Sequence, residues 1–207
     1  NTKGKIEPDS PLQYKPKEAI MDKKSRASQM AFEYHKSGFH CAEAMAKAFM
    51  EVYGNGSDPA IPKVASAFGG GVGRTKQELC GALAGGFISL GYLHGRSENT
   101  DNWDELADMT SRLRQKFESE HGTTRCAALL ESFGPQENMM RCKQLTGEVA
   151  GMLAENLEAS RRISVSRELT KIHEETVTGT VEEVRDDFAG RDSIKGEIVL
   201  VIDGSKT

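Results

Sequence analysis

The stretch FGGGVGRTKQELCGALAGGF, residues 68–87, holds seven of the chain's 21 glycines and one of its four cysteines. A glycine-rich loop is followed by apolar residues that recur every three or four positions, which predicts a helix over residues 78–93. In this helix Gly81 and Gly85 are four residues apart, so they lie on one face. Because glycine in a helix costs about 1 kcal/mol relative to alanine, we expect this bare face to admit a close neighbour, either another helix or a cofactor.

The chain on both sides of this stretch is also helical in pattern up to about residue 159. Three prolines among polar residues indicate a flexible arm over residues 1–17. Beyond the arm, apolar stripes recur at helical spacing, and no strand pattern appears before residue 160. Further helices are expected over residues 20–37, from residue 41 to the GNGSDP break, over residues 61–68 and 102–120, after the GTT at residues 122–124, and over residues 136–157. The sequence thus predicts an all-α four-cysteine domain over residues 18–159.

The pattern changes in residues 160–207, which we expect to form a small α/β fragment. RRISVSREL alternates apolar and polar residues as a strand does, TVEEVRDDFAG has the pattern of an amphipathic helix, and KGEIVLVID is typical of a buried strand. These three elements together have the size of a βαβ unit, and two strands alone must pack on something else to be stable. The predicted fold class is mainly α: a helical bundle-like domain followed by a small βαβ appendage.

Charge and composition argue against several function classes. The net charge is −4, and neither part of the chain has the basic surplus of a nucleic-acid-binding protein. Aromatic residues make up only 6% of the chain, which is too few for a base-stacking surface. The longest uncharged apolar run, Leu79 to Leu93, is shorter than the roughly 18 residues that a membrane helix needs. We expect a cytoplasmic protein without a membrane span, although a start at Asn1 leaves open whether a leader was removed.

The four cysteines share a position in their helices rather than a spacing in the sequence. Cys41, Cys80, Cys126 and Cys142 form no CxxC pair, but each lies in the first turn or two of a predicted helix and begins its apolar stripe. They could fill the core as small hydrophobic residues. Alternatively, helix N-termini stabilise thiolates, and several of them converging would hold a metal centre or an exchangeable dithiol.

Convergence depends on how the helices alternate. In an up-and-down bundle Cys41, Cys80 and Cys126 begin alternate helices and meet at one end. Cys142 would begin at the other end and joins them only if the helix after Cys126 is short. The glycine-rich loop is expected to leave backbone N–H groups free to point at an anion, with Arg74 adding charge. The candidate cofactor-binding positions are four glycines, Gly71, Gly73, Gly81 and Gly85.

Two of the histidines are close in sequence to a cysteine and are candidate additional ligands. His40 abuts Cys41, and His121 lies five residues before Cys126. The other histidines, His35 among them, are interpreted as surface or hydrogen-bonded residues, which is the commoner role of a lone histidine. No pair of carboxylates stands out as catalytic, because the acidic pairs of the tail have the pattern of a solvated face.

The order of these motifs resembles a family of redox-active proteins that is named for the pattern C, CGAxxG, C, C. The residues that carry the resemblance are SGFHCAEAM around Cys41, FGGGVGR, CGALAG from Cys80, GTTRC ending at Cys126, and a final Cys142. The resemblance covers about residues 25–155. It implies a compact helical domain whose four cysteines are grouped for redox or iron–sulfur chemistry. A similar domain occurs beside haems in split-Soret cytochromes, but this chain has no CxxCH, so the resemblance implies no haem here.

The tail resembles a different family. SRELTKIHEE, GTVEEV and KGEIVLVIDG, within about residues 161–204, are similar to the carboxy-terminal part of the ribosomal RNA small-subunit ribose-2′-O-methyltransferase of the tetrapyrrole-methylase superfamily. RELTK, residues 167–171, is the most specific match. The sequence lacks the amino-terminal domain of that family and the loops that bind S-adenosylmethionine, so the resemblance implies no methyl transfer by this chain.

These observations favour a redox function. The hypothesis is that four clustered cysteines, Cys41, Cys80, Cys126 and Cys142, bind an iron–sulfur or other thiolate-ligated metal centre or cycle between dithiol and disulfide. One alternative is a methyltransferase-related fragment without independent activity, and the other is a structural helical module with core cysteines. Whether the chain is an enzyme stays open. No nucleic-acid partner is expected, the electron-transfer partner is not identified, and a homodimer stays open.

Overall fold

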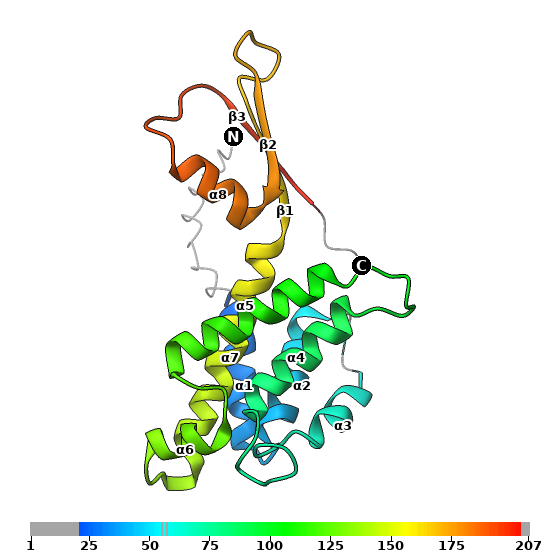
Figure 1. Cartoon of the computed structure of the whole chain (residues 1–207), viewed down its shortest axis with the longest axis vertical. Helices are drawn as coiled ribbons and strands as arrows, with labels where there is room; N and C mark the ends of the chain where they lie inside the picture. Colours follow the sequence, from blue (N-terminus) through cyan, green and yellow to red (C-terminus); the bar gives the residue numbers. More distant parts are fainter. Residues whose placement is uncertain (1–20, 55, 57, 204–207) are drawn as a thin grey trace, which may run out of the picture.

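A computed structural model describes residues 21–54, 56 and 58–203, so the predicted arm over residues 1–17 lies outside the described part. Up to residue 160 the described chain is helical (Figure 1). The elements are α1 (Lys23–Lys36), α2 (Cys41–Tyr53), α3 (Ala60–Ser66), α4 (Gly81–His94), α5 (Asp104–His121), α6 (Cys126–Phe133), the 3-10 helix η1 (Glu137–Met139) and α7 (Met140–Ser160). The prediction of a mainly α fold is confirmed, and the helix ends differ from the expected ones by only a few residues, except that α7 begins four residues later than expected.

The long helix α7 organises the helical part. It packs against α1, α2, α4 and α5, and α2 also packs against α1 and α4 (Figure 1). The apolar stripes of these helices meet in one core that excludes water from its largest side chains. Fully buried core residues include Met45, Phe49, Leu83, Leu113, Phe117, Val149 and Leu153. Burial of each such side chain contributes about 1.5–3 kcal/mol relative to exposure, so this core holds the helices in place.

The glycines of α4 allow α2 to cross it at very short range. A Cβ atom on Gly85 would lie 2.6 Å from the carbonyl oxygen of Ala42 and 2.9 Å from Cβ of Met45. A Cβ atom on Gly86, one residue further, would lie 3.0 Å from Leu113. Real side chains do not tolerate the first two distances, so Gly85 is required by the packing of the helices. The bare face predicted from the sequence is therefore covered by helix α2.

The tail forms a three-stranded antiparallel sheet with one helix. Its elements are β1 (Arg162–Arg167), β2 (Glu175–Thr180), α8 (Val181–Ala189) and β3 (Ile198–Ile202), and the strand order is β2-β1-β3. The predicted βαβ appendage is wrong in this detail, because β1 pairs antiparallel with both neighbours and β2 was missed. The sequence ETVTGT did not indicate β2, because a single large apolar side chain cannot show the alternation of apolar and polar residues that is typical of a strand.

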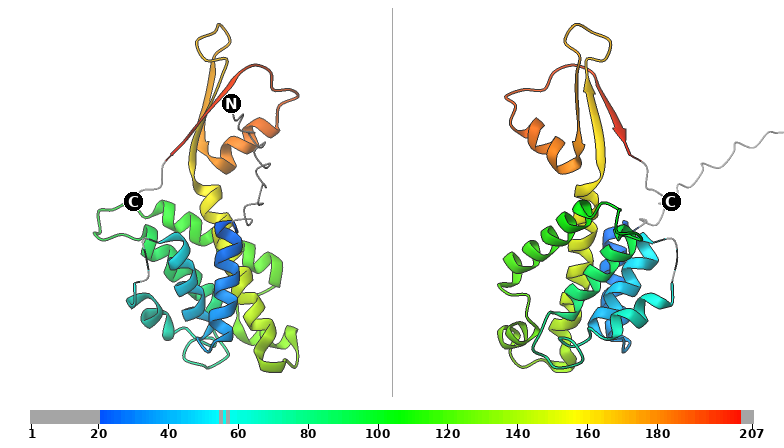
Figure 2. Two further views of the ribbon diagram at one scale, coloured as in Figure 1. Left: turned by 180° about the vertical axis from the view of Figure 1, so that it is seen from behind. Right: turned by 45° about the vertical axis from the view of Figure 1, so that its right-hand side comes forward.

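The prediction that residues 195–203 form a buried strand is also wrong. All five residues of β3 are exposed, with Val201 at 60% and Val199 at 42%. The reason is that β3 lies at the edge of the sheet, and α8 packs on β1 and β2 instead. The sheet extends from one end of the helical part, whereas α6 and the glycine-rich loop lie at the opposite end (Figure 2). No helix in the described ranges combines the length and apolar character needed to cross a bilayer.

Candidate functional site

A cavity of about 220 Å³ lies at the end of the bundle opposite the sheet, and all four cysteines line it. Each comes from a different helix. Cys41 is the first residue of α2, Cys80 is the N-cap of α4, Cys126 is the first residue of α6, and Cys142 is the third residue of α7. The N-termini of four helices therefore face one cavity. Their unpaired N–H groups and positive dipole ends make it a favourable place for sulfur atoms that carry negative charge.

Cys142 reaches this cavity because α6 is short. Only eight residues, Cys126–Phe133, form α6, and a turn with left-handed backbone at Asn138 and Met139 then returns the chain to the start of α7. Gln136 closes the new helix start. Its side-chain oxygen accepts a hydrogen bond from the backbone N–H of Cys142 at 3.2 Å, and its amide nitrogen lies 3.7 Å from Sγ of Cys142. The sequence predicted that Cys142 joins the other three cysteines only if the helix after Cys126 is short, and α6 is short.

Backbone pairing places Cys80 beside Cys126. The N–H of Cys80 donates to the carbonyl of Thr124 at 2.8 Å, and the N–H of Cys126 donates to the carbonyl of Glu78 at 2.7 Å. Leu79 and Arg125 form the antiparallel bridge between these two hydrogen bonds. Two cysteines that are 46 positions apart in the sequence thus enter their helices from one short two-stranded contact.

Two glycines make room for the cysteines themselves. A Cβ atom on Gly81 would lie 2.3 Å from Sγ of Cys41, so the sulfur occupies the space that a side chain would need. A Cβ atom on Gly71 would lie 2.7 Å from Cβ of Cys126. Gly71 also has a φ of +74°, which L side chains rarely adopt. The glycine that follows Cys80 in CGALAG therefore serves the approach of a second cysteine to the first.

The loop of residues 69–76 pairs several of its N–H groups with carbonyl groups of its own segment. The N–H groups of Gly73 and Arg74 donate to the carbonyls of Ala67 and Gly69, at 2.9 and 3.0 Å. The expectation of free N–H groups is wrong for Gly73 and Arg74, because the loop curls on itself through a run of positive φ angles. Gly70 differs: it lines the cavity, and its N–H favours the thiolate of Cys41 by lowering the pKa of that thiol. Of the four candidate cofactor-binding glycines, Gly81 lines the cavity, whereas Gly71, Gly73 and Gly85 are not among its lining residues.

Burial governs the protonation of the thiols. It raises the pKa of Cys80, which is 6% exposed, to about 12, and that of Cys126 to about 11, and it also raises those of Cys41 and Cys142. Backbone N–H groups oppose this effect: those of Leu83 and Ala82 favour the thiolate of Cys80, although its side chain accepts no cap hydrogen bond. At neutral pH the four thiols are protonated, and a metal that replaces the protons would find ligands already gathered.

The charged residues that line the cavity are cations. Arg74 and Lys76 lie on its wall, and none of the described lining residues is acidic. The charge of Lys76 lowers the pKa of both Cys126 and Cys142, although burial raises the pKa of these two thiols more strongly. Lys76 itself has a left-handed backbone, with a φ of +58°. A cation here would offset the charge of a thiolate site.

Two histidines also line the cavity, and one of them was not predicted. His40, a candidate ligand, lies on the wall, and the missing side chain of Gly69 leaves room for it. His35 was interpreted as a surface or hydrogen-bonded residue, and its Nδ1 does lie 2.8 Å from the hydroxyl of Thr146. It lines the cavity as well, which was not predicted. Burial lowers the pKa of His35 to about 4, so its imidazole is neutral at physiological pH. The signal was its spacing of four residues from Ala31 on the buried face of α1.

His121 does not belong to the site. It is not among the residues that line the cavity, and its ring packs against Phe117 with 4.7 Å between ring centroids. Its Nε2 atom lies 3.9 Å from a carboxylate oxygen of Glu148 and has no hydrogen-bond partner. Its position five residues before Cys126 was misleading because the chain turns at Gly122, where φ is +74°.

The spacing of the potential ligands limits what the cavity could hold. Among the described residues, no three His, Cys, Asp or Glu side chains lie close enough together to bind one metal ion. The four cysteines nevertheless share the cavity wall.

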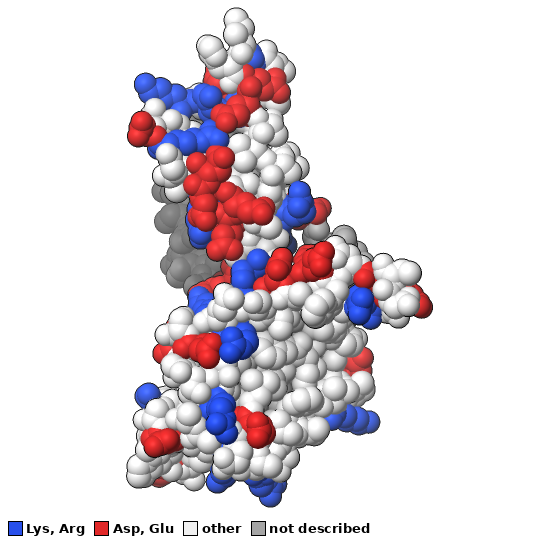
Figure 3. Space-filling view, in the orientation of Figure 1, with Lys and Arg blue, Asp and Glu red and all other residues white. Residues whose placement is uncertain are grey.

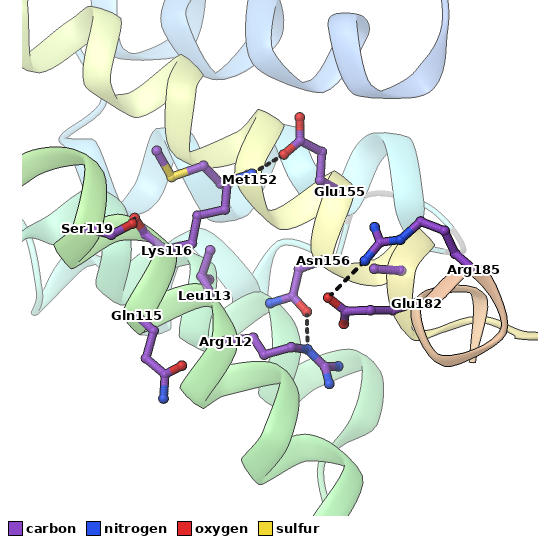
Figure 4. A pocket seen from close by; sticks show the side chains of 11 residues that line it. Arg112, Leu113, Gln115, Lys116, Ser119, Met152, Glu155, Asn156, Glu182 and Arg185 are labelled. Atoms are coloured by element: carbon purple, nitrogen blue, oxygen red, sulfur yellow. Dashed lines mark hydrogen bonds and ion pairs between the residues drawn. The ribbon is translucent and has the colours of Figure 1, made fainter. Parts of the chain in front are cut away.

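A second, larger cavity of about 550 Å³ lies between α5, α7 and α8 (Figure 4). Its polar groups already satisfy one another. Arg112 donates to Asn156 and Ser160, Lys116 pairs with Glu155, and Arg185 lies 3.8 Å from Glu182. The cysteine-lined cavity is therefore the stronger candidate for a functional site.

Comparison with known proteins agrees with the site. A family model described as "Putative redox-active protein (C_GCAxxG_C_C)" matches residues 39–156, a range that contains all four cysteines. The chain belongs to this family. No solved structure matches it.

The curated relatives match only a small part of the chain, and their names agree with the resemblance predicted for its tail. The ribosomal RNA small subunit methyltransferase I of Hydrogenobaculum sp. is 40% identical over 55 residues, which are 27% of this chain and 24% of that protein. The proteins of the same name from Rickettsia prowazekii and Bacillus subtilis are 46% identical over 54 residues and 47% identical over 58 residues. The chain spans 19% of the length of each of these two.

Proposed function

We propose that this chain is a redox protein in which Cys41, Cys80, Cys126 and Cys142 hold a thiolate-ligated metal centre, an iron–sulfur cluster in particular. The observation that carries the proposal is that four cysteines, each at the start of a different helix, line one cavity of about 220 Å³. An iron–sulfur cluster held by four thiolates would supply a centre that accepts and returns single electrons.

The donor set suits an iron–sulfur cluster, because such clusters are held by cysteine thiolates and all four cysteines line the same cavity. The N-termini of four helices and Lys76 on the wall support this further, because they offset the negative charge that four thiolates bring into a buried site.

A dithiol that cycles by exchange is less well supported. Exchange needs an accessible thiolate, whereas burial raises the pKa of all four thiols and leaves Cys80 only 6% exposed. The structural alternative, in which the cysteines only fill the core, does not account for the position of all four cysteines on the wall of one cavity.

Anaerobic purification tests the proposal. We expect iron and acid-labile sulfide in the protein and absorbance between about 320 and 450 nm, the range typical of iron–sulfur charge transfer. Single Cys→Ser changes at the four positions are expected to lower iron content and absorbance. The Ser89→Ala variant is a control, because Ser89 is buried in α4 but does not line the cavity. A colourless protein that binds neither iron nor zinc after anaerobic reconstitution would contradict the proposal.

We also propose that residues 18–159 fold as the cysteine domain and that the tail has no methyltransferase activity of its own. This is supported by the length of the match, which spans about a fifth of the curated methyltransferases. Equilibrium dialysis with S-adenosylmethionine should show no saturable binding; saturable binding would favour the methyltransferase-related alternative.

A further inference from the structure

The surface around the mouth of the cysteine-lined cavity has an unusual composition. We define the pocket rim as Val72, Arg74 and Lys76 from the loop of residues 69–76, together with Met139 and Met140 from the turn before α7. Arg74, Lys76 and Met139 line the cavity. Met140 directly follows Met139, and Val72 lies two residues before Arg74 in the same loop. The rim lies at the end of the molecule opposite the sheet (Figure 2).

The rim carries unneutralised positive charge. Neither Arg74 nor Lys76 makes an ion pair with any described residue, whereas most basic residues of α5 and the tail are paired. The nearest carboxylates along the chain, Glu78 and Glu137, do not line the cavity. Figure 3 shows basic side chains at the lower edge of the molecule, while acidic ones gather over α8 and the first turns of α5. The charge separation gives the cavity mouth a potential that attracts anions.

The rim also exposes apolar side chains. Val72, Met139 and Met140 are 38%, 39% and 38% exposed. Apolar side chains bordered by unpaired cations are typical of a surface that contacts another protein, and methionine is common in surfaces that adapt to a partner. A small anion would make no use of these side chains. Their presence beside the charges favours a protein as the occupant.

We propose that the pocket rim is the docking surface for an acidic one-electron carrier protein. Arg74 and Lys76 face carboxylates of the carrier, and Val72, Met139 and Met140 supply the apolar contact. In the docked complex a reduced carrier would lose one electron and a metal centre held by the four cysteines would gain it, with no atom transferred. The inference rests on the proposed function, because it requires a redox centre behind the rim.

Charge is tested first with two small oxidants of opposite sign. The reconstituted protein is reduced and mixed with ferricyanide or hexaammineruthenium(III) in stopped-flow experiments at several salt concentrations. With ferricyanide the rate constant should fall as salt rises, and with hexaammineruthenium(III) it should rise. The double variant Arg74→Glu, Lys76→Glu should lower the ferricyanide rate at least about tenfold at low salt and invert both salt dependences. Lys195→Glu is the matched control, because Lys195 is an exposed lysine of the tail.

Protein docking is tested next with a plant-type [2Fe–2S] ferredoxin as the acidic carrier. The variant Val72→Gln, Met140→Gln should slow electron transfer from reduced ferredoxin roughly tenfold, as loss of central apolar contacts does, and leave the ferricyanide rate unchanged. Circular dichroism checks that each variant is folded.

The results distinguish a failure of the docking proposal from a failure of the proposed redox function. A ferricyanide rate that is insensitive to salt and to charge reversal overturns the docking proposal, and so does a ferredoxin rate that the apolar variant does not change. If iron and sulfide are bound and the centre is reducible, the proposed function survives either result. If no probe exchanges electrons with the protein, the proposed function fails and the docking proposal fails with it.

Discussion

Replacing Gly81 by alanine should separate the role of the cysteine site from that of the helical core. The added Cβ would lie 2.3 Å from Sγ of Cys41 and 2.9 Å from the carbonyl oxygen of Phe68. Ordinary contact begins near 3.4 Å, so the sulfur must move by at least about 1.1 Å, and the carbonyl, which belongs to the backbone, cannot yield easily. Overpacking of this kind costs about 1–3 kcal/mol of stability. We also expect Cys41 to leave its place on the cavity wall.

The change is therefore expected to have two measurable effects. Guanidinium unfolding should show a loss of about 1–3 kcal/mol, and the reconstituted variant should bind less iron and show weaker absorbance than the wild type. Gly91→Ala is the matched control: it is the same change in the same helix, at an exposed glycine whose Cβ would meet nothing within 4 Å. That variant should bind iron normally and gain up to about 1 kcal/mol from helix propensity. Normal iron binding by a folded Gly81→Ala protein would refute the reasoning about Cys41.

Three further predictions concern the scaffold. Gly85→Ala brings a Cβ to within 2.6 Å of a carbonyl oxygen of α2 and should destabilise the protein by about 1–3 kcal/mol in guanidinium unfolding; an unchanged midpoint would show that α2 and α4 can separate freely. Hydrogen bonds from Lys116 and Lys24 lower the pKa of Glu155, so the carboxylate stabilises the fold above pH 4.5 and this effect is lost as the pH falls through the folded pKa. In Glu155→Gln the free energy of unfolding should therefore depend less on pH in the acid range, by less than about 1 kcal/mol. A chain that ends at Ser160 should keep its helical circular dichroism and its iron content; loss of both would contradict an independent domain over residues 18–159.

The helices could be predicted because their signals are local. Periodic apolar residues located every helix of the bundle, and the position of each cysteine at the start of an apolar stripe placed it at or near a helix N-terminus. Cys142 reaches the other cysteines only because α6 is short. The pattern of four apolar residues in α6 indicated a short helix. The tail was harder, because β2 has too few apolar residues for alternation to show and the exposure of β3 depends on what covers the sheet.

The errors at the site have a common physical origin, which is that backbone conformation and helix packing, rather than a pattern of side chains, decide the contacts concerned. The donors of Gly73 and Arg74 are consumed by carbonyls earlier in the loop, and backbone pairing of this kind follows from a run of unusual φ angles that the sequence does not specify. His121 was chosen over His35 on distance along the chain. The turn at Gly122 and the packing of α1 on α7 reverse that order in space.

By itself the sequence determined that this chain is mainly helical, that its cysteines begin helices and that glycines follow or precede them, because these features depend on residues a few positions apart. Only the tertiary structure decided that Cys41 fills the space beside Gly81, that His35 and Lys76 reach the same cavity, and that β3 lies uncovered at an edge. Such contacts depend on how helices far apart in the chain pack together, and packing is set by the fit of whole surfaces rather than by any local pattern.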